Sequence, residues 1–99
     1  MITAPGLLAK AAELMEERGK QYDKPQGERS MESVVQAFNI ITRHNLTESE
    51  GWLLMAVLKM VRDRQRETAH QDSCEDLIAY ASLYGEARLN EVETTTFSR

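Results

Sequence analysis

The sequence has little that could cross-link, break or anchor a chain: its 99 residues include one cysteine, two prolines and five glycines. The single thiol, Cys74, excludes an intrachain disulfide and a metal site built from several cysteines. No apolar run approaches the roughly 18 residues of a membrane span. The first residues lack the basic and apolar regions of a signal peptide. We therefore expect a cytoplasmic protein that makes no contact with a membrane.

Strand patterns and an excess of positive charge are also missing. Apolar and polar residues do not alternate, so helical periodicity is the main structural signal. The formal net charge is −4, which argues against a broad electrostatic surface for nucleic acid. A chain of this length forms one domain with a modest core, and such domains often gain stability by self-association.

The apolar periodicity predicts four helices, over residues 5–18, 31–43, 48–66 and 73–88. We expect Ser30 to cap the second helix. Thr47 and Glu50 have the spacing of a capping box for the third helix. Asp72 or Ser73 is expected to cap the fourth.

The predicted fold class is all-α: a compact four-helix protein with an antiparallel helix pair in its C-terminal half. Residues 1–88 form the helical domain, and residues 89–99 form a polar C-terminal tail. We expect an apolar face to be covered by a second copy, giving a dimer or a tetramer. The aromatic residues expected to contribute to that face are Phe38, Trp52 and Tyr84.

Residues 52–65, WLLMAVLKMVRDRQ, are apolar on most sides of a helix but carry Lys59 and Arg62 one turn apart. A tight turn near residue 69 would make the next helix antiparallel. Lys59 would then lie level with Tyr80, Arg62 with Asp76, and Arg66 with Asp72. One interpretation is a ladder of ion pairs that fixes helix register. The other is a polar pocket in which the cations bind an anion and the acids orient them.

A second polar cluster follows the first helix, in the stretch RGKQYDKPQGERS. Cations and an aromatic ring together suit contact with a phosphate and a base. The alternative is an exposed, solvated connection between helices. The candidate ligand residues in this cluster are Arg18, Lys20, Tyr22 and Arg29.

Glu13 and Glu16 on the first helix form an E-x-x-E pattern, which can share a divalent ion such as Mg²⁺ or can be a solvated face. His44 and His70 have no second histidine or cysteine at ligand spacing, so no zinc site is predicted. Cys74 falls on the apolar side of the fourth helix and is interpreted as a core residue.

Three segments, LLAKAAELMEERGKQYDKP, GWLLMAVLKMVRDRQ and DSCEDLIAYASLYGEA, resemble in that order a family of small helical proteins of tailed phages and prophages. The similarity covers about residues 7–88. It rests on Arg18 with Tyr22, on Lys59 with Arg62, and on a third motif that comprises Asp72, Ser73, Asp76 and Tyr80. The family resemblance implies a host-cell setting but no defined activity.

The helix pair is also similar, more distantly, to the all-α nucleotide pyrophosphatases of the MazG and dimeric dUTPase type. That resemblance implies helical oligomers that hydrolyse nucleoside triphosphates with Mg²⁺. The sequence departs from their acidic pattern, because Lys59 and Arg62 stand where an E-x-x-E would supply acids. On the next helix Asp76 matches the final acid, and Ser73 replaces the glutamate before it. Loss of metal ligands with retention of cations favours binding an anion over cleaving it.

The leading hypothesis is a phage-type protein that binds a nucleotide or a nucleotide-derived anion and sequesters a host signalling nucleotide as counter-defence. The ligand residues are those of the two polar clusters: Arg18, Lys20, Tyr22, Arg29, Lys59, Arg62, Asp72, Asp76 and Tyr80. No metal or cofactor is required.

Two other function classes stay open. One is a Mg²⁺-dependent nucleoside triphosphate pyrophosphohydrolase that uses Glu13, Glu16 and Asp76. The other is an inhibitor that binds a host protein through a helical face. Loss of pyrophosphate release on replacing these acids would distinguish the first, and a co-purifying host protein the second.

Overall fold

The computed structural model describes residues 1–21 and 30–94, and every regular element in that part of the chain is a helix. The helices are α1 (Ala4–Gln21), α2 (Met31–Thr42), α3 (Glu48–Arg64) and α4 (Gln71–Thr94). The predictions of an all-α class and of four helices are confirmed. None of the described helices combines the length and the apolar character needed to cross a membrane.

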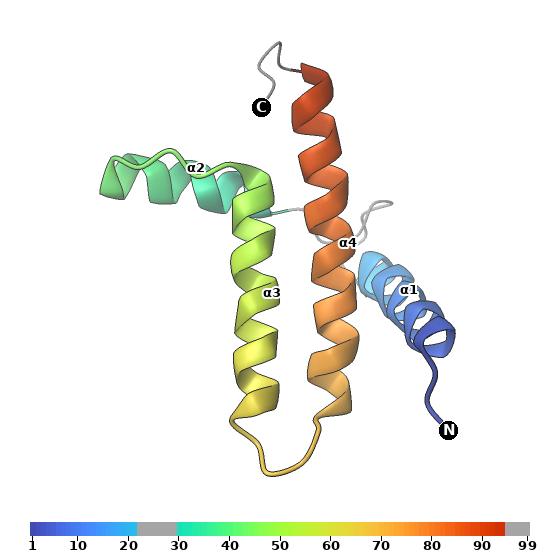
Figure 1. Cartoon of the computed structure of the whole chain (residues 1–99). Coiled ribbons are helices and arrows are strands. Elements are labelled where there is room, and N and C mark those ends of the chain that lie inside the picture. The colour runs from blue at the N-terminus through green and yellow to red at the C-terminus, as the bar shows by residue number, and fades with distance from the viewer. Residues whose placement is uncertain (22–29, 95–99) are drawn as a thin grey trace.

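The centre of the fold is an antiparallel hairpin of α3 and α4 (Figure 1). In Figure 1, α1 packs on α4, whereas α2 packs on α3 and projects away from the hairpin. The radius of gyration is 15.0 Å, compared with about 13 Å for a compact domain of 100 residues. The antiparallel pair is confirmed, but the arrangement is more open than the compact protein that we predicted.

The hydrophobic core forms where the two halves of the hairpin face each other. Trp52 of α3 packs with Leu83 and Ala87 of α4, and Met15 and Met31 reach this cluster from α1 and α2. The prediction that Trp52 contributes to an oligomer face is wrong, since only 4% of the residue is exposed. Its indole N–H donates to Glu48 Oε2 at 3.1 Å, which satisfies the one polar group that its burial removes from water.

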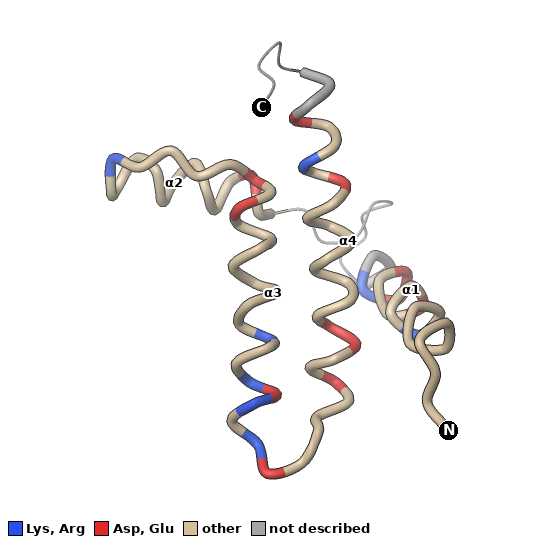
Figure 2. Tube along the Cα trace, viewed as in Figure 1, with Lys and Arg blue, Asp and Glu red and all other residues tan. Residues whose placement is uncertain are grey.

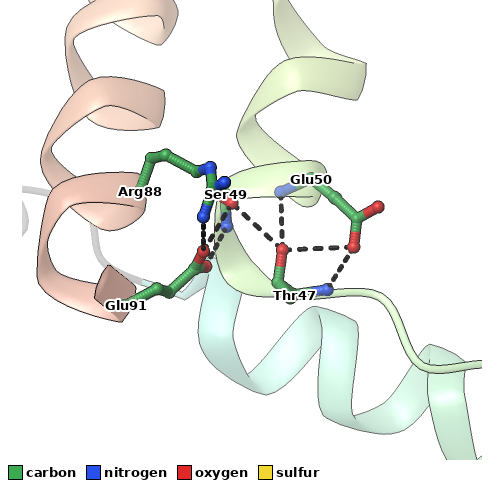
Figure 3. Close-up of polar contacts among 5 residues, drawn as sticks. All are labelled: Thr47, Ser49, Glu50, Arg88 and Glu91. Atoms are coloured by element: carbon green, nitrogen blue, oxygen red, sulfur yellow. Dashed lines mark hydrogen bonds and ion pairs between the residues drawn. The ribbon is translucent and has the colours of Figure 1, made fainter. Parts of the chain in front are cut away.

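Side-chain caps stabilise the N-terminal ends of α3 and α4. Thr47 and Glu50 form the predicted capping box at α3, with Thr47 N–H donating to Glu50 Oε1 at 2.9 Å (Figure 3). The predicted cap of α4 is wrong, because the helix begins before Asp72, at Gln71. His70 caps it instead: Ser73 N–H donates to His70 Nδ1 at 3.3 Å, and Ser73 Oγ lies 2.6 Å from the same atom.

The last helix is longer than its sequence pattern predicted. It extends to Thr94 instead of ending near residue 88, so the helix includes the beginning of the segment that we described as a polar tail. No glycine or proline follows Gly85 to stop the helix. This extension brings Glu91 level with the start of α3, where it makes contacts described below.

Candidate functional site

Three helices bring charged side chains together at Asp76. Arg18 of α1 places its Nη2 atom 3.0 Å from Asp76 Oδ1, and Lys59 of α3 places Nζ 3.1 Å from Asp76 Oδ2. The side chains of Lys59 and Asp76 are 13% and 15% exposed, whereas that of Arg18 is 42% exposed. We refer to Arg18, Lys59 and Asp76 as the polar node. It holds two cations and one anion, so it carries a surplus positive charge.

An aromatic pair adjoins the polar node. Lys59 Nζ lies 6.0 Å from the centroid of the Tyr80 ring, at the outer limit of a cation–π contact. On α3, Trp52 stacks with Tyr80 at a centroid separation of 5.8 Å and an interplanar angle of 26°. The Lys59 ammonium group is therefore held between a carboxylate and an aromatic ring, which fixes its position.

The electrostatics of the polar node act on Asp76. Burial acts to raise the pKa of its carboxyl group, but hydrogen bonds and charge from Lys59 and Arg18 outweigh this effect. The pKa of Asp76 is therefore lowered from its ordinary value of 3.8. The carboxylate stays ionised at neutral pH and holds both cations in place.

The predicted pairing of Arg62 with Asp76 and of Arg66 with Asp72 is wrong. Asp76 pairs with Lys59 and Arg18 in place of Arg62, and Arg62, Arg66 and Asp72 are exposed. The reason is helix geometry. Lys59 follows Trp52 by two turns and so points to α4 as Trp52 does, while Arg62 is rotated by about 80° from that direction. Lys59 does adjoin Tyr80, as predicted.

Figure 2 shows positive charge concentrated in the second half of α3, beside the first turns of α4. A pocket of about 280 Å³ opens between these two segments. Its walls combine two cations, two small polar or ionic groups and apolar side chains, including the thiol-bearing Cys74. Lys59 belongs both to this pocket and to the polar node, so the two features are continuous. The lining residues are Lys59, Met60, Asp63, Arg64, Ser73, Cys74 and Leu77.

Several predicted site residues are not brought to the polar node. Tyr22, Arg29 and the side chain of Lys20 lie outside the described residues. Glu13 and Glu16 are exposed on α1. Within residues 1–21 and 30–94, no three acidic, histidine or cysteine side chains form a group that could hold a metal ion. The role of these acids in hydrolysis stays a prediction.

A further group of polar contacts, among Ser49, Arg88 and Glu91, joins the start of α3 to the end of α4 and was not predicted from the sequence (Figure 3). Glu91 accepts from Ser49 N–H at 3.1 Å and from Ser49 Oγ at 2.9 Å, while Arg88 Nη1 lies 3.9 Å from Glu91 Oε2. Ser49 is 2% exposed. The available signal was the helix register, since an antiparallel pair with Arg62 near Asp76 places Ser49 near residue 89.

Neither a curated protein nor a solved structure matches this chain. A family model described as a domain of unknown function, DUF6378, matches residues 6–88. That range includes all three members of the polar node and the whole of α2 and α3. The chain therefore belongs to the DUF6378 family.

Proposed function

We propose that the protein binds a nucleotide or a nucleotide-derived anion at the polar node and in the adjoining pocket. The observation that carries this proposal is the convergence of Arg18 and Lys59 on one carboxylate, beside Tyr80. Two cations that share one acid keep a positive charge that an incoming anion can neutralise. Asp76 would then serve to orient the cations.

The two cations would have different roles. Lys59 is buried between Asp76 and Tyr80, so it is positioned by the protein. Arg18 is more exposed, and its planar guanidinium group suits bidentate contact with a phosphate. In the pocket, Met60 and Leu77 offer apolar contact for a base or ribose, and Arg64 adds a cation at the wall.

The biological role follows from the resemblance to small phage proteins and is part of the same proposal. The ligand would be a host signalling nucleotide, and binding would remove it from the host cytoplasm as counter-defence. The proposal includes a MazG-like helical architecture and a homo-oligomer. Because Lys59 and Arg62 replace the acids of the pyrophosphatases, we propose retention of the ligand without hydrolysis.

Thermal melting with a panel of mono-, di-, tri- and cyclic nucleotides, and with inorganic phosphate, tests this proposal. A nucleotide at a hundredfold excess over its dissociation constant should stabilise the folded protein by about 2.7 kcal/mol through mass action. Arg18→Met should remove this response. Lys10→Met replaces an exposed cation on the same helix and should preserve it.

The opposite results would contradict the proposal. If no nucleotide raises the melting temperature of the wild type, the polar node is a structural ion pair. If inorganic phosphate alone stabilises the protein as well as any nucleotide does, the site recognises phosphate without a base. Release of pyrophosphate from a nucleoside triphosphate with Mg²⁺, lost in Glu13→Gln or Asp76→Asn, would favour the hydrolase.

A further inference from the structure

An apolar stripe on α3 extends from Met60, at the wall of the pocket beside α4, to the side of the helix that α4 does not cover. Its members are 43% to 64% exposed, although all are aliphatic or thioether side chains. They recur at the spacing of one helix face. We call this set the α3 stripe: Leu53, Leu54, Val57, Met60 and Val61. Lys59 points about 160° away from Val57 around the helix, so the α3 stripe and the polar node lie on opposite sides of α3.

The α3 stripe is symmetric about Val57. Leu53 and Val61 lie four residues before and after it, and Leu54 and Met60 lie three residues before and after it. A two-fold axis through Val57 would pair each aliphatic side chain with another of similar size. Such self-complementarity is what an isologous contact between two identical helices requires.

Two oppositely charged residues near the ends of α3 are also placed symmetrically about Val57. Glu50 precedes Val57 by seven residues and Arg64 follows it by seven. Seven residues make nearly two turns, so both point within about 20° of the direction of Val57. Figure 2 shows acidic residues at the start of α3 and basic residues at its end. Antiparallel pairing would place Glu50 of each copy level with Arg64 of the other.

The exposed area is large enough for a stable interface. The solvent-accessible area of the chain is 7730 Å². A monomeric protein of this mass exposes about 5,700 Å², so the whole chain exposes roughly 2,000 Å² more than a typical monomer. Obligate homodimers bury about 1,000–2,500 Å² on each partner. A helix that is apolar on two sides is central in a bundle, and within the described residues α4 covers only one side of α3.

We propose that a second copy of this chain docks on the α3 stripe, with the two α3 helices antiparallel about a two-fold axis through Val57. The two hairpins then form a four-helix layer around the α3 pair. The polar node lies on the opposite side of α3 from this interface, whereas Met60 and Arg64 belong both to the interface and to the wall of the pocket.

Light scattering coupled to size-exclusion chromatography, at micromolar concentration, provides the first test. The wild type should have twice the mass of the chain. Leu54→Lys places an ammonium group in the α3 stripe and should weaken association at least tenfold. Leu89→Lys is the matched control, because Leu89 of α4 is 68% exposed against 64% for Leu54, and it should remain dimeric.

A cysteine at the axis provides a second test, which does not depend on a disruptive variant. Helices in contact lie 8–10 Å apart, which brings facing Cα atoms on the axis within reach of a disulfide. Val57→Cys, with Cys74→Ser to remove the native thiol, should form a covalent dimer on mild oxidation. Leu89→Cys in the same background should stay monomeric under denaturing conditions.

Three results would overturn the proposal. The first is a wild type that is monomeric at micromolar concentration. The second is a dimer in which Val57→Cys does not cross-link, which would assign the contact to another face, such as Phe38 and Ile41 of α2. The third is equal loss of association in Leu54→Lys and Leu89→Lys. Cross-linking at Val57 within a larger assembly would support the α3 pair.

Discussion

The Nζ atom of Lys59 lies 3.1 Å from Oδ2 of Asp76, and this ion pair joins the two helices of the hairpin. Both side chains are largely buried, whereas the second cation on the same carboxylate, Arg18, is partly exposed. The buried pair therefore has a structural role in the free protein. In the proposed function, Arg18 is the cation that would exchange Asp76 for a ligand.

The first prediction concerns Lys59. Lys59→Met leaves Asp76 buried with Arg18 as its one remaining ion-pair partner among the described residues, and should lower the free energy of unfolding by about 1–3 kcal/mol. Replacing both members, Lys59→Met with Asp76→Leu, should restore most of that loss because no buried charge is left unpaired. Denaturation by urea measures each variant.

Arg62→Met is the matched control for Lys59→Met. Arg62 is exposed on the same helix, so its replacement should change the free energy of unfolding by less than about 0.5 kcal/mol. A loss in Arg62→Met as large as that in Lys59→Met would show that Arg62 holds Asp76 in solution, as the sequence alone suggested.

The second prediction concerns pH. The pKa of Asp76 is lowered in the folded protein from its ordinary value of 3.8, so the unfolded chain binds a proton more readily. The carboxylate therefore adds stability at pH values above its unfolded pKa, and that contribution is lost as pH falls through the folded pKa. Asp76→Asn should be less stable than wild type at neutral pH, and the difference should shrink below about pH 4.

Asp72→Asn provides the comparison for the pH experiment. Asp72 is exposed in the first turn of α4, so this variant should keep the acid-dependent loss of stability that we expect of the wild type. If Asp76→Asn loses as much stability at acid pH as wild type does, another group is responsible for that loss. The role assigned to the ion pair of Asp76 with Lys59 would then be wrong.

The sequence predicted the helices well because their signals are local. Apolar spacing and the Thr47–Glu50 capping box lie within a few residues of each other, and the structure confirms both. The presence of Asp76 and Lys59 in one site was also predictable, because one antiparallel hairpin brings their helices together. Their direct pairing was not, since it depends on the difference of about 60° between the directions of Lys59 and Arg62 around α3.

Other features could not be predicted because they join distant parts of the chain. Arg18 meets Asp76 across 58 positions, and nothing in its local sequence indicates which helix α1 packs on. Glu91 meets Ser49 across 42 positions, in a segment that we predicted as tail. Val34, Phe38 and Ile41 are exposed because, among the described helices, α2 packs only on α3. Periodicity indicates an apolar face without saying what covers it.

The third prediction concerns the Ser49–Glu91 contact shown in Figure 3. Glu91→Leu leaves the buried Ser49 N–H and hydroxyl without their carboxylate, and should cost about 1–3 kcal/mol in the free energy of unfolding. Glu91→Gln keeps an acceptor and loses only the charge near the start of α3, so it should cost about 0.3–1 kcal/mol.

Asn90→Leu controls for the added apolar side chain in the Glu91 experiment. Asn90 is the exposed neighbour of Glu91, and its replacement should change stability by less than about 0.5 kcal/mol. Equal stability of Glu91→Leu and Asn90→Leu would show that the end of α4 does not hold the start of α3.

The last prediction uses two glycines with opposite surroundings. A Cβ atom at Gly51 of α3 would lie 2.5 Å from Met31 Sδ and 2.8 Å from Val35 Cγ1, so these side chains or α2 itself must shift. A Cβ atom at Gly85 of α4 would meet nothing within 4 Å.

Alanine is favoured over glycine in a helix by about 0.5–1 kcal/mol at either position. Gly85→Ala should therefore stabilise the protein by that amount, while Gly51→Ala should destabilise it by about 1–3 kcal/mol. Thermal or urea denaturation of both variants separates the two effects, because they share the change in helix propensity. If Gly51→Ala is as stable as Gly85→Ala, then α2 does not pack on α3 at Gly51, and the open arrangement of the helices would have to be revised.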